Sequence, residues 1–466
     1  MLTTTKERLL SLLRPAGQER LIAFWDSLTA EQRERLAGQI EAIDYPLIDR
    51  LAREESSAES IRALADRAGS PPSVRLGDPA NRFSPEEARR RGGEALRAGK
   101  IGVMLVAGGQ GTRLGFDHPK GMFPVGPVSN RTLFEIHLDK LLAVARRYGR
   151  SIPLYLMTSP ATHDETVAYF REKGDFGLSD DLFVFCQGTM PAVDAASGKI
   201  LLASPGSLAL SPDGHGGMLA ALAKAGGLDH ARGRGIEQIF YFQVDNPLVD
   251  IASPEFLGYH LLAGSEMTTQ VVRKRAAKEK VGNVVAVDGR LRVIEYSDLP
   301  DEIAERRNAD GSLAIWAGSI AVHAFAVDFL HRAAANADAL PFHRAHKKVA
   351  HLGPSGERVE PNRPNAVKFE RFIFDLMPWA KNALVVEVDP QEHFGPLKNA
   401  SGDAQDTPET VRAQLVALHT RWLREAGAEV EDGVPVEISP RFALDVEELK
   451  TRIGRGVRIV GSTYFR

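Results

Sequence analysis

A short apolar run that breaks into a glycine-rich turn constrains the fold most strongly. Residues 101–115 read Ile-Gly-Val-Met-Leu-Val-Ala-Gly-Gly-Gln-Gly-Thr-Arg-Leu-Gly, and Pro-Lys-Gly-Met-Phe-Pro follows at 119–124. The run from Val103 to Val106 predicts a buried parallel strand. The turn after it consists of residues with little or no side chain to keep a ligand off the backbone: Ala107, Gly108, Gly109 and Gly111. Successive N–H groups in such a turn form a nest for phosphate oxygens, and Arg113 and Lys120 add positive charge. We therefore expect a polyphosphate-binding loop.

The spacing of the glycines narrows the kind of loop. A Walker loop requires Gly-Lys-Ser or Gly-Lys-Thr, and neither tripeptide occurs in the sequence. The dinucleotide fingerprint, counted from Gly109 and Gly111, needs a glycine where Leu114 stands, and Arg113 lies inside it. An NAD-dependent dehydrogenase, which shares this kind of sheet, is therefore disfavoured. A glycine-rich turn without any ligand is the simpler alternative.

The complete segment resembles the nucleotide loop of the UDP-sugar pyrophosphorylases and is most similar to that of the UDP-N-acetylglucosamine pyrophosphorylases. The resemblance runs over most of the chain and is weakest after residue 440. It implies a UTP:sugar-1-phosphate uridylyltransferase, in which a sugar 1-phosphate attacks UTP and pyrophosphate leaves. Arg113 and Lys120 then act on the phosphates, as does Lys398 in the family-like segment Phe-Gly-Pro-Leu-Lys-Asn-Ala.

Two further motifs carry expected nucleotide and metal contacts. Gln187 follows a predicted strand, and its amide can donate and accept at once, as the edge of uracil requires. A turn residue bonding its own backbone is the alternative, but the resemblance implies a uracil contact, with Gly214 also beside the nucleotide.

Asp245 ends another predicted strand in Val-Asp-Asn, where an Asx turn is the simpler reading. By resemblance it holds Mg²⁺ (or Mn²⁺), which prefers one or two carboxylates plus substrate phosphates.

The residues expected to contact the sugar leave its identity open. The resemblance assigns Gly282 and Glu295 to this contact. His215 and Ser319 stand where the N-acetylglucosamine enzymes carry asparagine, and His215 matches the Gly-His-Gly of the glucose-directed relatives. We therefore expect broadened specificity, with N-acetylglucosamine 1-phosphate slightly favoured over glucose 1-phosphate.

The apolar pattern changes along the chain and predicts three parts. Residues 1–98 read as a helical region, with a capping box at Thr29 and a connector over Val74–Asn81. Residues 99–400 alternate apolar runs with amphipathic helices, which is typical of a doubly wound, mostly parallel α/β sheet that binds a nucleotide. Residues 401–466 predict a small C-terminal domain.

Composition limits the partners. The 466 residues carry 58 basic and 61 acidic side chains, so the net charge of −3 implies no general attraction to nucleic acid or anionic membranes. We see no membrane span or secretory signal, and the single cysteine, Cys186, suits a reducing cytoplasm. The sequence leaves the oligomeric state open. A non-catalytic sugar-nucleotide sensor is the remaining alternative, although a sensor would have no need of all four of Arg113, Lys120, Asp245 and Lys398.

Overall fold

The computed structural model describes residues 5–53, 58–336, 339–454 and 456–466. The chain forms two compact units, each assembled from separate stretches of sequence. Unit 1 consists of Met1–Ile61, Gln187–Met218 and Leu340–Asp375, and unit 2 consists of Arg62–Cys186, Leu219–Ala339 and Leu376–Arg466. The division expected near residues 98 and 400 stays a prediction.

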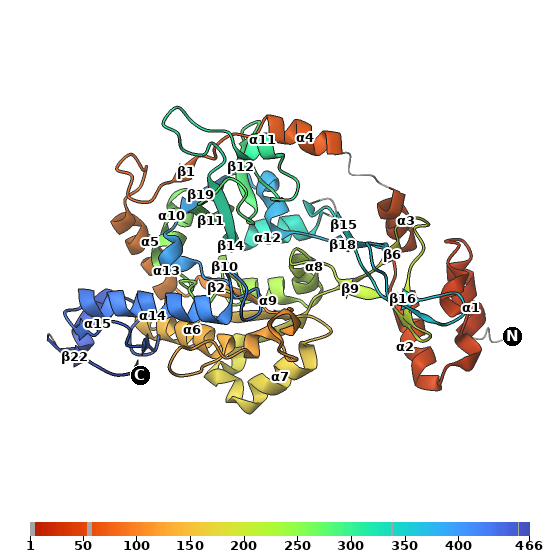
Figure 1. The fold of residues 1–466 in the computed structure, drawn as a ribbon, viewed down its shortest axis with the longest axis horizontal. Helices are drawn as coiled ribbons and strands as arrows, with labels where there is room; N and C mark the ends of the chain where they lie inside the picture. Colours follow the sequence, from red (N-terminus) through yellow and green to blue (C-terminus); the bar gives the residue numbers. More distant parts are fainter. Residues whose placement is uncertain (1–4, 54–57, 337–338, 455) are drawn as a thin grey trace. The chain divides into compact units, whose positions relative to one another are not determined.

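Unit 2 is built on a ten-stranded sheet whose main path runs β1-β19-β11-β14-β10-β2-β3-β4 (Figure 1). Its strands are β1 (Ser73–Val74), β2 (Ile101–Val106), β3 (Leu154–Thr158), β4 (Leu182–Cys186), β10 (Gln238–Gln243), β11 (Met267–Arg273), β12 (Asn283–Val287), β13 (Arg290–Ile294), β14 (Ala317–Ala326) and β19 (Ala383–Glu387). Neighbours along the path pair in parallel except at β14, which is antiparallel to both β10 and β11. The mostly parallel α/β sheet is thus confirmed.

Helices cover both faces of this sheet. Phe240 and Phe242 of β10 pack in one core with α5 (Pro85–Arg97), α6 (Leu133–Tyr148) and α10 (Pro254–Leu262). On β3, Tyr155 turns the other way toward α9 (Gly227–Gly233), and its hydroxyl lies 3.1 Å from His230 Nδ1. Since consecutive residues of a strand point to opposite faces, both faces are buried, as a doubly wound sheet requires.

The remaining α-helices belong to both units. They are α1 (Thr5–Leu13), α2 (Ala30–Glu41), α3 (Tyr45–Arg53), α4 (Ala58–Asp66), α7 (His163–Glu172), α8 (Gly217–Lys224), α11 (Asp301–Ala304), α12 (Val327–Ala334), α13 (Pro390–His393), α14 (Pro408–Glu425) and α15 (Val446–Arg452). The capping box at Thr29 is confirmed, with Gln32 N donating to Thr29 Oγ1 at 3.2 Å. The connector over Val74–Asn81 instead begins inside strand β1, which pairs with β19 at the sheet edge.

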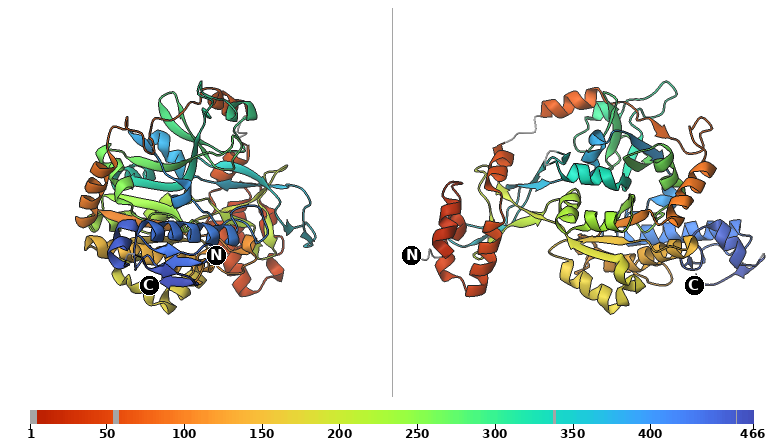
Figure 2. Two further views of the ribbon diagram at one scale, coloured as in Figure 1. Left: turned by 60° about the vertical axis from the view of Figure 1, so that its left-hand side comes forward. Right: turned by 180° about the vertical axis from the view of Figure 1, so that it is seen from behind.

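Unit 1 joins the N-terminal helices to strands from much later in the chain. Its strands are β5 (Thr189–Pro191), β6 (Val193–Asp194), β7 (Leu202–Ser204), β8 (Ser207–Leu208), β9 (Leu210–Pro212), β15 (His343–Lys347), β16 (His351–Leu352), β17 (Arg358–Val359) and β18 (Ala366–Glu370). The red N-terminal helices lie beside these strands in Figure 2, and Leu36 and Ile40 of α2 share a core with Leu208 and Phe369. The helical N-terminal region therefore contributes packing.

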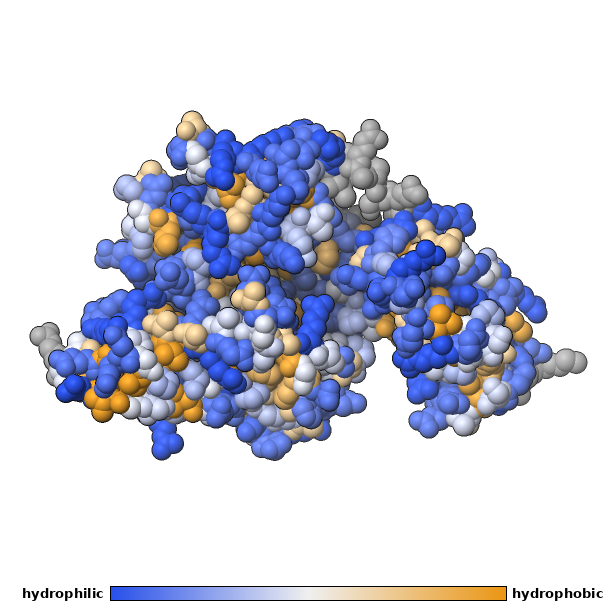
Figure 3. Space-filling model, in the orientation of Figure 1, coloured by the Kyte–Doolittle hydropathy of each residue, from blue (hydrophilic) through white to orange (hydrophobic). Residues whose placement is uncertain are grey.

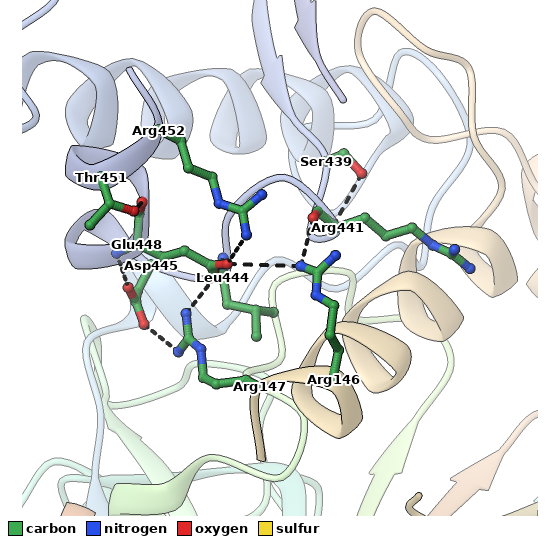
Figure 4. A network of polar contacts seen from close by, with 9 residues as sticks. All are labelled: Arg146, Arg147, Ser439, Arg441, Leu444, Asp445, Glu448, Thr451 and Arg452. Atoms are coloured by element: carbon green, nitrogen blue, oxygen red, sulfur yellow. Dashed lines mark hydrogen bonds and ion pairs between the residues drawn. The ribbon is translucent and has the colours of Figure 1, made fainter. Parts of the chain in front are cut away.

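The C-terminal part of unit 2 is fastened to α6. It contains α14, α15 and the strands β20 (Glu429–Val430), β21 (Val436–Ile438), β22 (Arg458–Ile459) and β23 (Thr463–Phe465). Arg147 of α6 donates to Asp445 Oδ2 and to Glu448 Oε2, both at 2.6 Å, and Arg452 donates to the other oxygen of Glu448 at 2.6 Å (Figure 4). Because the carboxylate of Glu448 is shared, the network fixes α15 more firmly than isolated surface pairs would.

A membrane-spanning helix has to be both long and apolar. Within the described ranges, every helix is too short or too polar to cross a bilayer. The face drawn in Figure 3 is largely hydrophilic, with apolar residues scattered over it.

Candidate active site

The glycine-rich turn leaves the carboxyl end of β2 and doubles back on itself. Ala107 N donates to Met157 O at 2.8 Å, and Ser159 Oγ donates to Gly108 O at 2.7 Å, so β3 and the residue after it hold the start of the turn. Lys120 N then donates to Gly109 O at 3.0 Å, which closes the turn. The turn thus lies at the strand end where α/β sheets bind ligands.

The two central glycines have different reasons to be glycine. A Cβ at Gly111 would lie 2.7 Å from both Cδ1 and the carbonyl oxygen of Phe116, so folding itself excludes a side chain there. A Cβ at Gly109 would meet no atom within 4 Å, and its φ lies outside the left-handed region. Gly109 is also exposed. Packing therefore does not require a glycine at 109, whereas a ligand resting on the backbone would.

The predicted phosphate-binding cations lie around Asp245. Lys120 Nζ donates to Leu397 O at 3.1 Å, and Leu397 N donates to Asp245 O at 2.8 Å. Burial lowers the pKa of Lys120 below its usual range, the negative charge of Asp245 opposes this, and Lys398 and Arg113 lower it further. The structure thus brings together the three predicted cations and the predicted metal ligand.

A cavity of about 210 Å³ opens beside these charges. It is lined by five residues that the sequence assigned to metal, phosphate or sugar: Asp245, Gly282, Glu295, Ser319 and Lys398. A Cβ at Gly282 would lie 2.8 Å from Val293 Cγ1 and 3.5 Å from Glu295 Oε1, so glycine keeps this wall open. These five predicted residues of unit 2 therefore converge on one hollow.

An irregularity of β14 shapes the wall that carries Ser319. The register against β11 shifts between Thr269 and Val271, which pair with His323 and Ser319. Ala321, inside the shifted stretch, has a φ of 56°, a conformation that non-glycine residues rarely adopt. Bulges of this kind re-aim side chains near active sites. Ser319 Oγ accepts a long bond of 3.4 Å from Ala321 N and lines the cavity.

Asp245 suits a metal that is held mainly by substrate. No group of three or more His, Cys, Asp or Glu side chains is arranged to hold a metal ion in the part of the chain that the structure describes. The Asx turn does form, but it belongs to Asn246, whose Oδ1 accepts from Leu248 N at 3.2 Å. The Asp245 carboxylate stays available, and one carboxylate plus phosphate oxygens matches the preference of Mg²⁺.

In unit 1, Gln187 is tied to the loop that carries Gly214. Its Nε2 donates to Asp213 Oδ1 at 3.3 Å and to Gly214 O at 3.4 Å. Gly214 has a φ of +83°, and a Cβ there would lie 2.4 Å from Arg371 O. The Gln187 side chain therefore bonds this loop rather than its own backbone.

His215 is a neutral single donor. Its Nδ1 accepts from Ile373 N at 3.3 Å, and its ring stacks on Phe372 with centroids 5.3 Å apart. Burial, aided by the charge of His343, lowers the pKa of His215 to about 4. The proton of the neutral ring is therefore on Nε2, which can donate one hydrogen bond to a ligand.

The sequence left several cavity residues without a role. Lys280, Tyr296 and Phe394 line the cavity with the predicted set, as does Asn246. Tyr296 is 47% exposed, which is unusual for so large an aromatic side chain. These four residues lie close in sequence to the predicted Gly282, Glu295, Lys398 and Asp245, and that proximity was the sequence feature that could have indicated them.

Comparison with known proteins settles the family. A family model described as UTP--glucose-1-phosphate uridylyltransferase matches residues 49–453. UDP-N-acetylglucosamine pyrophosphorylase of Saccharomyces cerevisiae is 36% identical over 471 residues, which cover 97% of this chain and 98% of that protein. UDP-N-acetylhexosamine pyrophosphorylase-like protein 1 of Xenopus tropicalis is 37% identical, covering 95% of this chain and 91% of that protein. The crystal structure of the uridine diphosphate N-acetylglucosamine pyrophosphorylase from Trypanosoma brucei superimposes with a TM-score of 0.83 at 25% identity, covering 98% of each chain. This chain therefore belongs to the UTP--glucose-1-phosphate uridylyltransferase family, the UDP-sugar pyrophosphorylases, and is a nucleotidyltransferase.

Proposed function

We propose that this protein forms UDP-N-acetylglucosamine and pyrophosphate from UTP and N-acetylglucosamine 1-phosphate. The observation that carries the proposal is the convergence of Asp245, Lys398, Gly282, Glu295 and Ser319 on one cavity. The names of its relatives from Saccharomyces cerevisiae and Trypanosoma brucei support the same substrate. A sensor without catalysis would have no need of this combination of carboxylate and cations.

The proposed reaction requires alignment and charge neutralisation rather than a protein nucleophile. A phosphate oxygen of the sugar 1-phosphate attacks the α-phosphorus of UTP, a new P–O bond forms, and the bond to the β-phosphate breaks as pyrophosphate leaves. The attacking oxygen is already anionic near neutral pH, so no side chain has to activate it. Positioning of the two polyanions can supply ~7–11 kcal/mol of the barrier reduction.

Each predicted residue has one task in this scheme. The backbone at Ala107, Gly108, Gly109 and Gly111 receives the triphosphate, and Arg113, Lys120 and Lys398 offset its charge. Mg²⁺ (or Mn²⁺), when held by Asp245, supplies further positive charge at the phosphates. Gln187, with Gly214, is assigned to the uracil.

Two residues argue for limited sugar discrimination. Ser319 is shorter than an asparagine amide, and His215 offers a single N–H to a sugar hydroxyl or phosphate. A pocket that tolerates an acetamido group without bonding it discriminates weakly. Glucose 1-phosphate is therefore the second candidate substrate, and His215→Asn is expected to shift kcat/KM toward the acetamido sugar.

We propose a cytoplasmic location for the protein. The single cysteine of the chain, Cys186, can form no internal disulfide, which supports the proposed cytoplasmic location.

One assay tests the proposal. Purified protein is incubated with UTP, Mg²⁺ and a panel of sugar 1-phosphates, and pyrophosphate release is followed with and without a chelator. We expect release with N-acetylglucosamine 1-phosphate, slower release with glucose 1-phosphate, and loss of both when the metal is removed. A preference above ~10³-fold for either sugar, about 4 kcal/mol, would contradict the broad pocket.

A further inference from the structure

Side-chain amides and backbone groups of neighbouring segments, not helix or strand pairing, hold the loop that carries Lys398. Residues 394–398 follow α13 without regular structure. Leu397 N donates to Asp245 O at 2.8 Å, and Lys398 N donates to Asp406 O at 2.8 Å. The loop therefore depends on neighbours for its shape.

Asn246 bonds this segment through both ends of its side-chain amide. Its Nδ2 donates to His393 O at 2.7 Å, and its Oδ1 accepts from Gly395 N at 3.1 Å. The same oxygen accepts from Leu248 N at 3.2 Å, which fixes the turn after β10. The side chain is only 4% exposed. One amide thus joins the turn that carries Asp245 to both ends of the short segment that leads into the Lys398 loop.

We propose that Asn246 is a positioning residue for uridylyl transfer. It holds the 393–398 segment against the Asp245 turn, so that Lys398 and Asp245 face the same cavity. The inference rests on the proposed function, because it concerns the geometry of that site. Asn246 acts through the loop, since both lone pairs of its oxygen and one of its N–H groups are already committed to backbone groups.

Removing the amide should therefore reduce turnover more than it reduces binding. Asn246→Ala deletes three hydrogen bonds, while the backbone bond from Leu397 to Asp245 stays possible. A displacement of about 1 Å at a catalytic group can cost ~100-fold in rate. We expect kcat to fall about 10- to 100-fold, with KM for UTP changing less than about 3-fold.

The matched control is Asn81→Ala. The Asn81 amide also bonds two backbone groups of one loop, donating to Arg75 O at 2.6 Å and accepting from Arg75 N at 2.8 Å. It does not line the active-site cavity. Asn81→Ala should lower the unfolding temperature while kcat stays within about twofold of wild type.

A double-mutant cycle with Lys398→Ala separates positioning from general destabilisation. If Asn246 acts through the loop, adding Asn246→Ala to Lys398→Ala should lower kcat by less than about threefold. If Asn246→Ala does not fold, the same cycle is run with the nearly isosteric Asn246→Asp, which places an oxygen against His393 O. Full additivity, or loss of stability with unchanged kcat as in Asn81→Ala, would overturn the inference.

Hydrogen exchange provides a readout that does not depend on activity. The Leu397 amide, bonded to Asp245 O, should exchange at least about tenfold faster in the folded Asn246→Ala protein than in wild type, and at the wild-type rate in Asn81→Ala. Unchanged Leu397 protection would refute the positioning role. An inactive wild-type protein with the expected exchange pattern would instead count against the proposed function alone.

Discussion

The pair Gly109 and Gly111 allows a direct test of whether the turn after β2 receives a ligand. Gly109→Ala adds a methyl group into open space at an ordinary φ, so it should leave the fold intact. Loss of a glycine's freedom in the unfolded chain should even raise the free energy of unfolding by about 0.4–1 kcal/mol. Gly111→Ala pushes its methyl group to 2.7 Å from Phe116 and should lower it by about 1–3 kcal/mol.

Although Gly109→Ala should not destabilise the protein, it should strongly reduce activity. A phosphate oxygen that accepts from this backbone lies about 2.9 Å from the amide nitrogen, so a methyl group in the open space forces it away. Loss of one charge-assisted hydrogen bond costs about 1.5–3 kcal/mol, which corresponds to a fall of about 10- to 150-fold in kcat/KM for UTP.

Denaturant unfolding and pyrophosphate release measure the two quantities on the same preparations. We expect Gly109→Ala to be at least as stable as wild type but much less active. Wild-type kcat/KM for UTP in this variant would refute the assignment of the triphosphate to Gly109. If Gly109→Ala lost as much stability as Gly111→Ala, the conclusion that a methyl group at position 109 points into open space would be refuted.

Three further results are expected. Asp245→Asn is nearly isosteric and should keep the fold but lose most turnover, because the carboxylate is proposed to hold the metal; near-normal turnover at low Mg²⁺ contradicts this. Ser319→Asn should raise kcat/KM for N-acetylglucosamine 1-phosphate relative to glucose 1-phosphate, measured by pyrophosphate release with each sugar; an unchanged ratio removes Ser319 from the specificity argument. Burial lowers the pKa of His137, His260 and His419 to about 3, so below the ordinary histidine pKa the unfolded chain binds more protons than the folded one. The free energy of unfolding should therefore decrease as the pH falls below ~6.5, by about 2 kcal/mol per histidine at pH 5 relative to neutral pH, and equal values at pH 7.5 and 5 would contradict these pKa shifts.

Local pattern was enough to predict the strands and helices next to the site. The apolar run before the glycines became β2, and α6 is one of the amphipathic helices expected over residues 99–400, beginning behind a capping box at Thr132. The strand predicted just before Gln187 is β4, which ends at Cys186. Such elements are encoded by residues close together in sequence, so a single sequence can reveal them.

Features set by distant residues were not predictable in this way. The antiparallel direction of β14 could not be predicted from its sequence. A buried strand has the same apolar pattern whether its neighbours run parallel or antiparallel to it. The role of Asn246 was hidden for the same reason, since its partners near His393 and Gly395 lie about 150 residues further along the chain. Within the region expected to be helical, residues 1–98, the chain forms two short turns at Glu19–Ile22 and Trp25–Ser27 in place of a regular helix.

The pairing of β1 with β19 has a consequence for synthesis on the ribosome. Arg75 and Glu387, which bond across this edge at 2.8 Å, are separated by 312 positions in the chain. At ~5–20 residues per second, β19 emerges about 15–60 s after β1. Once β11 has been made and until β19 follows, β11 has no partner on the side that β19 later occupies, and exposed strand edges pair readily with other chains. Nascent chains halted before Ala383 are therefore expected to be the aggregation-prone species, and the demand for chaperones should fall sharply once β19 has been made.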